Sequence, residues 1–369
     1  MLTGQALSRF RKNLLEWFAQ FQRDLPWRRT KEPYRIWLSE IMLQQTRVAA
    51  VIPYYERFVE RFPGVNTLAD APQEEVLRLW AGLGYYSRAR NFQKAAQQIV
   101  VRHGGIFPST REEALALPGI GSYTSAAILS IAYGKKLAVL ESNVARVLAR
   151  IGAIHGDLRA GNRWRQLQKT ADAFLAPKSP GNWNQAMMEL GATICSPRSP
   201  KCLLCPVNDF CQARKLGLVD AIPEKRKKRA TVEIALASFV LVDRKGHTLL
   251  LPPPKRKSAH TADVGALVSR MWHFPTVEVQ GSTGGEWRQR FERAFLSGRK
   301  LRAIFKPLAK VRHSVTYRSL TVFPVRASVR QLPRLKGAKC LLLSDLASVP
   351  VSNLTRKVTR VAMSLADQK

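Results

Sequence analysis

Residues 5 to about 194 carry apolar side chains at intervals of three or four positions, which predicts a run of α-helices. Pairs of glycine and proline, which interrupt helices, separate them: Pro63-Gly64, Gly104-Gly105, Pro118-Gly119 and Pro180-Gly181. Residues 2–21 have the same spacing with interspersed arginines and no compact apolar core, so they predict an amphipathic helix rather than a signal peptide. We expect residues 1–194 to form one helical domain.

After residue 231 the apolar residues alternate with polar ones, which predicts β-strands. The expected strands are residues 232–236, 238–242, 247–251 and 317–325. A helix is expected at residues 287–296, and Asn353 is the expected N-cap of a last helix that reaches Leu365. Residues 232–369 are therefore expected to form an α+β domain.

The chain is strongly basic. Its 60 Lys and Arg residues against 26 Asp and Glu give a formal net charge of +34, and such an excess indicates a polyanionic partner, by default nucleic acid. No apolar run is long enough to span a membrane, which argues against a membrane partner. Residues 223–231, between the two domains, include Lys225-Arg226-Lys227-Lys228-Arg229. A solvated linker explains this cluster better than a phosphate contact or an import signal does.

Four of the five cysteines share the spacing Cys-x6-Cys-x2-Cys-x5-Cys: Cys195, Cys202, Cys205 and Cys211. Soft thiolates this close together favour an iron–sulfur cluster. A Cys-x2-Cys pair also suits tetrahedral zinc, so zinc stays open from the spacing alone. The loop and its tail, residues 195–222, bury little and should depend on the metal centre for order. Thiols kept for such a centre indicate a reducing compartment, and Cys340 is expected to be a buried apolar residue.

The segment Leu117-Pro118-Gly119-Ile120-Gly121, followed by Ser122-Tyr123-Thr124, predicts a tight turn that opens a helix. Backbone N–H groups around Gly119 and Gly121 would point outward together and bind phosphate. Together with the cysteine loop, this segment resembles the helix-hairpin-helix DNA glycosylases of the endonuclease III superfamily. Within that superfamily the chain is similar to the MutY-type adenine DNA glycosylases, strongly up to residue 211 and patchily afterwards.

The resemblance implies a mainly α helix-hairpin-helix glycosylase domain, a 4Fe–4S cluster on the four cysteines and a C-terminal Nudix-like domain. It also implies base excision repair, in which adenine opposite 8-oxoguanine or guanine is removed from double-stranded DNA. We expect a monomer in the cytoplasm, associated with a bacterial nucleoid. A thymine–guanine mismatch glycosylase and a catalytically weakened damage-binding protein remain as alternatives. The clustered glutamates of a Nudix catalytic box are missing, so pyrophosphate hydrolysis is not expected.

Glu40 is the one carboxylate in residues 36–46, a mostly apolar segment that predicts a helix. Burial disfavours the charged carboxylate, so the pKa of Glu40 should be raised and the side chain can stay protonated near neutral pH. Taken alone, the residues favour a core glutamate paired with Arg28 or Arg47. The resemblance instead implies that Glu40 donates a proton to N7 of the adenine.

Glu141, in Glu141-Ser142-Asn143, is the second candidate carboxylate. The family has Asp-Gly-Asn here, so the resemblance implies that Glu141 and Asn143 face the sugar. A carboxylate there stabilises an oxocarbenium ion as the glycosidic bond breaks. Glutamate is longer than aspartate by ~1.5 Å, so the enzyme is either adjusted to a longer acid or impaired. A plain helix N-terminal charge is the competing interpretation of Glu141.

The resemblance also implies a set of DNA contacts. Wedge residues that extrude the base would be Gln44, Gln45 and Tyr85, while either Tyr85 or Tyr86 should be ordinary core. The adenine pocket would be walled by Trp27, Arg28, Tyr123 and Gln185. Superfamily members that also cut the DNA backbone carry a lysine near the hairpin, where this chain has Tyr123 and no lysine between Lys94 and Lys135. A monofunctional glycosylase is therefore expected.

The base opposite the adenine is read, in the family, by a Phe-Ser-His element on a hairpin of the second domain. This chain has Val315-Thr316-Tyr317 at that place. Thr316 keeps a hydroxyl and Tyr317 keeps an aromatic ring with a polar tip, but the histidine is lost. We expect a preference for 8-oxoguanine that persists and is weaker than in the family.

Overall fold

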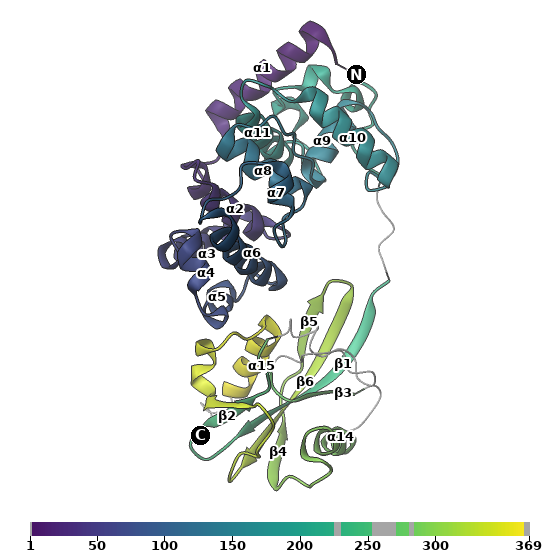
Figure 1. Ribbon diagram of the computed structural model, residues 1–369. Helices are drawn as coiled ribbons and strands as arrows, with labels where there is room; N and C mark the ends of the chain where they lie inside the picture. The colour runs from purple at the N-terminus through teal and green to yellow at the C-terminus, as the bar shows by residue number, and fades with distance from the viewer. Residues whose placement is uncertain (1, 225–229, 253–270, 280–283, 365–369) are drawn as a thin grey trace. The chain divides into compact units, whose positions relative to one another are not determined.

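The computed structural model describes residues 2–224, 230–252, 271–279 and 284–364 (Figure 1). The chain forms two compact units, one of Met1–Asp70 with Asn91–Lys227 and one of Ala71–Arg90 with Lys228–Lys369. Lys225 to Arg229 of the expected linker and Leu365 of the expected last helix lie outside the described residues. Within the described ranges, every helix is too short or too polar to cross a bilayer.

The described residues up to 194 are mainly helical, as the apolar spacing predicts, and residues 195–224 contain only short helices. The longer helices are α1 Gly4–Phe21, α2 Pro33–Leu43, α3 Val48–Arg61, α5 Gln73–Trp80, α6 Ser87–His103, α8 Ser122–Tyr133, α9 Ser142–Ile151, α10 Gly161–Phe174 and α11 Pro180–Thr193. Short helices complete this part: η1 Pro26–Arg28, α4 Val65–Asp70, α7 Arg111–Leu115, η2 Cys202–Leu204, η3 Asn208–Phe210 and α12 Gln212–Lys215.

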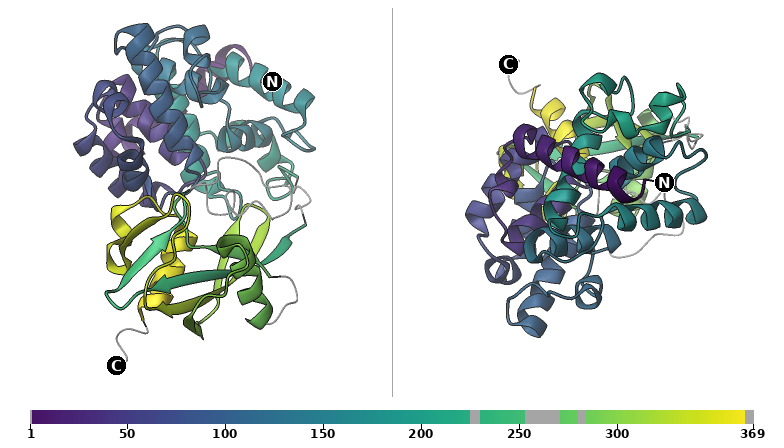
Figure 2. Two further views of the ribbon diagram at one scale, coloured as in Figure 1. Left: turned by 60° about the horizontal axis from the view of Figure 1, so that its bottom comes forward. Right: turned by 90° about the horizontal axis from the view of Figure 1, so that it is seen from above.

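Aromatic packing joins the ends of this helical region. The apolar face of α1 packs along α11 (Figures 1 and 2). At its centre the ring of Phe10 lies 5.5 Å from Phe174, 5.9 Å from Trp183 and 5.6 Å from Phe210, as measured between ring centroids. Buried side chains of α9 belong to the same core. This core therefore fixes α9 and α11 beside the loop that carries the cysteines.

The second unit contains a mixed β-sheet in the order β3-β1-β6-β4, with β5 also paired to β6. Only the β1–β6 pairing is parallel within this sheet. The strands of this sheet are β1 Val232–Val242, β3 Thr276–Glu278, β4 Ala303–Pro307, β5 Val311–Val315 and β6 Arg318–Val329. A separate antiparallel pair is formed by β2 His247–Leu250 and β7 Lys339–Leu342. Among the described residues of this unit, the helices are α14 Gly284–Leu296, η4 Leu343–Ser348 and α15 Asn353–Met363.

Two helices cover opposite faces of the sheet (Figure 1). Alternate residues of β1 explain this, because Leu236 and Val240 pack with α15 while Ala237 and Phe239 pack with α14. Both faces are thus buried, which is why residues 234–242 of β1 are all apolar except Ser238.

Three expectations for this unit are corrected. Residues 232–242 form one strand instead of two, because Ala237 itself pairs with Phe323 in the parallel register. The N-cap of α15 is Ser352, whose hydroxyl accepts a hydrogen bond from the Thr355 N–H at 3.1 Å. Cys340 is exposed on β7 rather than buried.

Candidate active site and cluster loop

A cavity of about 630 Å³ lies among η1, α2, α8, α9 and α11. Most of the site residues expected from the sequence line it: Trp27, Arg28, Glu40, Gln44, Gln45, Gly119, Gly121, Tyr123, Glu141, Asn143 and Gln185. Tyr85, Thr316 and Tyr317 are not among its lining residues. Segments far apart in the sequence thus converge on one cavity, whose wall carries three carboxyl groups, those of Glu40, Glu141 and Glu189.

Glu40 sits in the buried part of α2 and is only 6% exposed. Burial raises its pKa to about 7, and the nearby Glu141 carboxylate adds to that effect. The Tyr123 hydroxyl donates a hydrogen bond to Glu40 Oε2 at 2.5 Å, which opposes the rise. The pairing with Arg28 that the residues alone favoured is wrong, since Arg28 Nη2 donates instead to Glu189 Oε2 at 2.7 Å. Glu40 is therefore poised to give up a proton near neutral pH.

The position of Glu141 is compatible with both interpretations that the sequence left open. It is the N-cap of α9, where its Oε1 accepts a hydrogen bond from the Val144 N–H at 3.0 Å. It also lines the cavity. Burial raises the pKa of Glu141, while hydrogen bonds from the Asn143 and Val144 backbones act in the opposite direction. Capping and cavity lining are thus compatible at this position.

Glu189 is an ion-pair centre that the sequence did not suggest. Its side chain is 1% exposed and accepts hydrogen bonds from Arg23 Nε at 2.6 Å and Arg28 Nη2 at 2.7 Å. Burial alone would raise the pKa of Glu189, but the two guanidinium groups outweigh it and the pKa lies below its ordinary value. The pair fixes Arg28 at the cavity wall. In the sequence, only the presence of Arg23 and Arg28 shortly before α2 could have indicated such an ion pair.

The turn before α8 has the geometry of an anion-binding hairpin. Gly119 has φ +82°, and a Cβ there would stand 2.9 Å from Cβ of Asn91, so a larger residue does not fit. Gly121 is the N-cap of α8 and Ser122 begins the helix, which leaves N–H groups of the first turn without side-chain acceptors. The expected turn is confirmed, and its helix N-terminus suits a phosphate.

Two of the three expected wedge residues, Gln45 and Tyr85, lie on strained backbone. The helix expected over residues 36–46 ends at Leu43, because Gln44 leaves helical geometry and Gln45 has φ 57°. Tyr85 has φ 47° and is 43% exposed, whereas Tyr86 is 2% exposed. The expectation that one tyrosine of this pair is core is confirmed. Non-glycine residues in the left-handed region are uncommon and cluster at functional sites.

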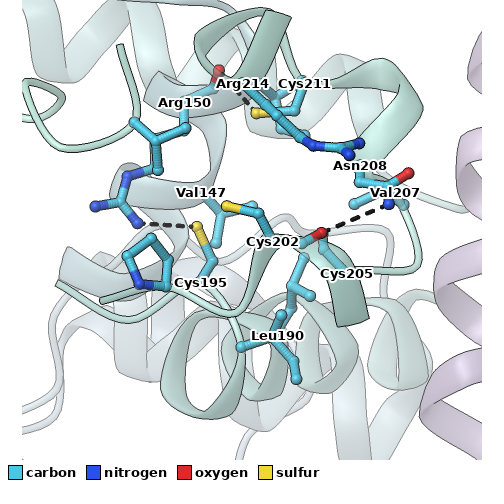
Figure 3. Close-up of a pocket in the computed structure, with 14 residues that line it drawn as sticks. Val147, Arg150, Leu190, Cys195, Cys202, Cys205, Val207, Asn208, Cys211 and Arg214 are labelled. Atoms are coloured by element: carbon cyan, nitrogen blue, oxygen red, sulfur yellow. Dashed lines mark hydrogen bonds between the residues drawn. The ribbon is translucent and has the colours of Figure 1, made fainter. Parts of the chain in front are cut away.

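The four cysteines of the loop line one cavity, together with Val147 and Leu190 (Figure 3). Within the described residues, none of the four forms a disulfide bond. Burial raises the pKa of Cys205 to about 12 and also raises that of Cys211, so thiolates here need a cationic centre beside them. Four thiol groups around one cavity are soft ligands that suit an iron–sulfur cluster or a zinc ion.

Two arginines of α9, neither of which the sequence pointed to, connect the cavity to this loop. Arg150 Nη1 lies 3.3 Å from Cys195 Sγ, close to where a cluster would be bound (Figure 3). Arg146 donates to the Cys195 carbonyl at 2.9 Å and to Asn143 Oδ1 at 2.9 Å. The spacing of four residues on one helix places both guanidinium groups on the same face. The end of α9 that begins at Glu141 is thereby tied to the cysteine loop.

Comparison with known proteins agrees with this geometry. A model of the HhH-GPD superfamily of base excision DNA repair proteins matches residues 38–173, and the iron-sulfur binding domain of endonuclease III matches residues 195–211. An adenine DNA glycosylase of Mus musculus is 34% identical, with the match covering 95% of this chain and 77% of that protein. The chain belongs to the adenine DNA glycosylase family. The expected 4Fe–4S cofactor and the helix-hairpin-helix glycosylase fold are confirmed by these matches.

Other adenine DNA glycosylases match over shorter lengths. The Homo sapiens enzyme is 48% identical over 56% of this chain, and the match spans only 39% of the human protein. Among solved structures, a thermostable thymine-DNA glycosylase aligns with 57% of this chain and 97% of its own, at 29% identity and a TM-score of 0.53. The similarity to that structure lies in the helical glycosylase fold.

Proposed function

We propose that this protein removes adenine mispaired with 8-oxoguanine or guanine from double-stranded DNA. The observation that carries the proposal is Glu40, a buried carboxyl with a pKa of about 7 on the wall of a cavity that it shares with Glu141. A purine leaves easily only after it has been protonated, and a carboxyl of this pKa is protonated on a large fraction of molecules at neutral pH. The cavity of about 630 Å³ has room for an extruded nucleotide.

The proposed reaction uses the two carboxyl groups in sequence. Glu40 gives its proton to N7 of the adenine, the bond between N9 and the sugar C1′ breaks, and the electron pair leaves with the base. Glu141 stabilises the positive charge on the sugar from the other side. A water oxygen then bonds to C1′ and its proton passes to a carboxylate, which leaves an abasic sugar. Tyr123 keeps Glu40 in place through its hydrogen bond.

The cysteine loop has a structural part in this proposal. The cluster, when bound, supplies a cationic centre that orders residues 195–211. Arg146 donates to the Cys195 carbonyl and Arg150 to the Cys195 sulfur, and these contacts join the loop to α9. Excision is a hydrolysis in which nothing is oxidised or reduced. We therefore assign no step of the reaction to these residues.

The second unit is proposed to be a Nudix-like domain that reads the base opposite the adenine. Support comes from the β5–β6 hairpin, whose strands pair from Val315 with Arg318 onward and leave Thr316 and Tyr317 at the tip. Thr316 has φ 56° and is exposed, and its hydroxyl donates a hydrogen bond to the Val315 carbonyl at 2.7 Å. We further propose that the protein acts as a monomer in the bacterial cytoplasm, on the nucleoid.

The test is a single-turnover assay on duplexes with adenine opposite 8-oxoguanine, adenine opposite guanine, or thymine opposite guanine, followed by alkali. We expect adenine release, fastest opposite 8-oxoguanine, that is abolished in Glu40→Gln. Thymine release would favour the mismatch glycosylase that the aligned thymine-DNA glycosylase structure raises. Tight binding with no base release would favour a damage-binding protein. A borohydride-trapped adduct formed at the excision rate would contradict a monofunctional enzyme.

A further inference from the structure

The loop between α5 and α6 presents an aromatic side chain on a strained backbone. Three of its residues lie in the positive-φ region: Gly82 at 123°, Gly84 at 72° and Tyr85 at 47°. Glycine tolerates such angles, but tyrosine does so at a cost of the order of 1–3 kcal/mol. Strain of this size persists only where neighbouring groups hold the loop in place. The Tyr85 ring is 43% exposed at this point.

Arg88, on the first turn of α6, is the group that holds the loop. Its Nη2 donates to the carbonyl oxygens of Leu83 at 3.2 Å and Gly84 at 3.1 Å. Its guanidinium carbon lies 5.4 Å from the ring centroid of Trp80 and 5.4 Å from that of Tyr85. Trp80 also donates from Nε1 to the Gly84 carbonyl at 3.2 Å. One guanidinium therefore contacts both the backbone of the loop and the ring at its tip.

The burial of Arg88 makes these contacts effective. The residue is 9% exposed, and burial lowers the pKa of its guanidinium to about 10, which leaves it cationic at neutral pH. Cation–π attraction is stronger when the cation is desolvated. The planar guanidinium group has several N–H donors and two flat faces, so it can contact two carbonyls and two aromatic rings at once, whereas a lysine ammonium group cannot.

We propose that Arg88 is a positioning residue that holds the Tyr85 ring ready to enter the duplex when the base is extruded. This rests on the wedge role proposed for Tyr85 and goes beyond it by naming what sets its geometry. A preordered ring avoids the entropy of ordering during insertion. Arg88 acts through Tyr85, so its effect should appear only when a paired base must leave the helix.

The experiment compares Arg88→Met, Arg88→Lys and Tyr85→Ala in single-turnover adenine release. Each is assayed on a duplex with adenine opposite 8-oxoguanine and on the same sequence with the adenine in an unpaired bubble. Arg57→Met is the matched control, because Arg57 also lies over a tyrosine ring, at 4.8 Å from the Tyr54 centroid, on an exposed part of α3. Visible absorbance of the cluster and thermal unfolding show whether each variant is folded.

On the duplex we expect Arg88→Met to slow release by about tenfold or more, since a misplacement of about 1 Å costs on the order of 100-fold. On the bubble it should equal the wild type, Arg88→Lys should recover part of the loss, and Arg57→Met should change neither rate. A 2-aminopurine next to the mispair should report slower extrusion in Arg88→Met. Equal loss of rate on both substrates, or no loss on either while Tyr85→Ala is impaired, overturns the proposal.

Failure of the underlying function has a different signature. If wild type releases no adenine from either substrate, the proposed glycosylase activity fails. If Tyr85→Ala matches wild type on the duplex, the wedge role of Tyr85 fails, and the role of Arg88 fails with it.

Discussion

Glu40 owes its chemistry to its position on the buried face of α2, where water does not solvate a charge. The sequence predicts this much, because the apolar residues around Glu40 already imply a raised pKa. The sequence does not predict which carboxylate pairs with Arg28. Arg28 is five residues from Arg23 in sequence, and both turn to Glu189 at distances that only the packing of α11 beside η1 creates. Long-range polar pairs of this kind leave no periodic signal in a sequence.

Glu40→Gln should stabilise the fold at alkaline pH. The pKa of Glu40 is about 7 in the folded protein against an ordinary 4.5, so the native state binds more protons and its stability falls as pH rises between those values. Glutamine is neutral and keeps an acceptor for Tyr123. At about 1.4 kcal/mol per pKa unit, the variant should gain about 3 kcal/mol at pH 8 and nothing at pH 4. Denaturant unfolding at both pH values measures it, and an equal difference at both contradicts the burial argument.

Glu141→Gln should separate capping from catalysis. The amide oxygen can still accept the Val144 N–H, so the free energy of unfolding should change by well under the ~1 kcal/mol that a lost cap costs. Adenine release should fall by about 100-fold or more, since the negative charge near the sugar is gone. The Glu141 charge also helps to raise the pKa of Glu40. The alkaline fall of the residual rate should therefore move to lower pH, and an unmoved profile would argue against this coupling.

At the scale of elements, the sequence located most helices and strands but not all of their ends. Helix α2 stops at Leu43 because Gln45 takes a left-handed backbone that apolar spacing does not encode. Strand β1 continues through Ala237 because parallel pairing with β6 spans the expected break. Ser352 caps α15 in place of Asn353. Serine and asparagine are both common N-cap residues, so two adjacent residues of these types do not show which one caps the helix.

The ion pair that joins η1 to α11 should support both fold and site. Glu189→Gln leaves Arg28, which is only 11% exposed, without its charged partner, and breaking a buried pair destabilises by the order of 3 kcal/mol. The pKa of Glu189 lies below its ordinary value in the folded protein. Its contribution is thus present above the unfolded-state pKa and is lost as pH falls through the folded one. Thermal unfolding at pH 7 and pH 3 should show a large difference from wild type only at pH 7.

At the scale of the whole molecule, composition alone predicted a polyanionic partner, and the family match agrees with it. A net charge of +34 acts on any duplex, so it adds affinity without specificity. What composition did not predict is how the chain divides, since residues 71–90 group with the C-terminal part rather than with the helices that flank them.

The affinity for undamaged duplex should fall steeply with salt, because cationic residues that neutralise phosphates release bound counterions. We expect log K against log salt to be linear with a slope more negative than about −5, as for six or more phosphate contacts. Fluorescence anisotropy between about 50 and about 200 mM salt, where the dependence is linear, measures the slope. A slope near −1 would show that the excess charge has little part in binding.

The most direct test of the account is the pH dependence of single-turnover adenine release by the wild-type protein on an adenine–8-oxoguanine duplex. Glu40 must hold its proton to act, and its pKa is about 7, so the rate should level off at low pH and fall about tenfold per pH unit above pH 7. Glu40→Gln should be inactive throughout. A wild-type rate that stays constant or rises from pH 6 to pH 9 would contradict proton donation by Glu40.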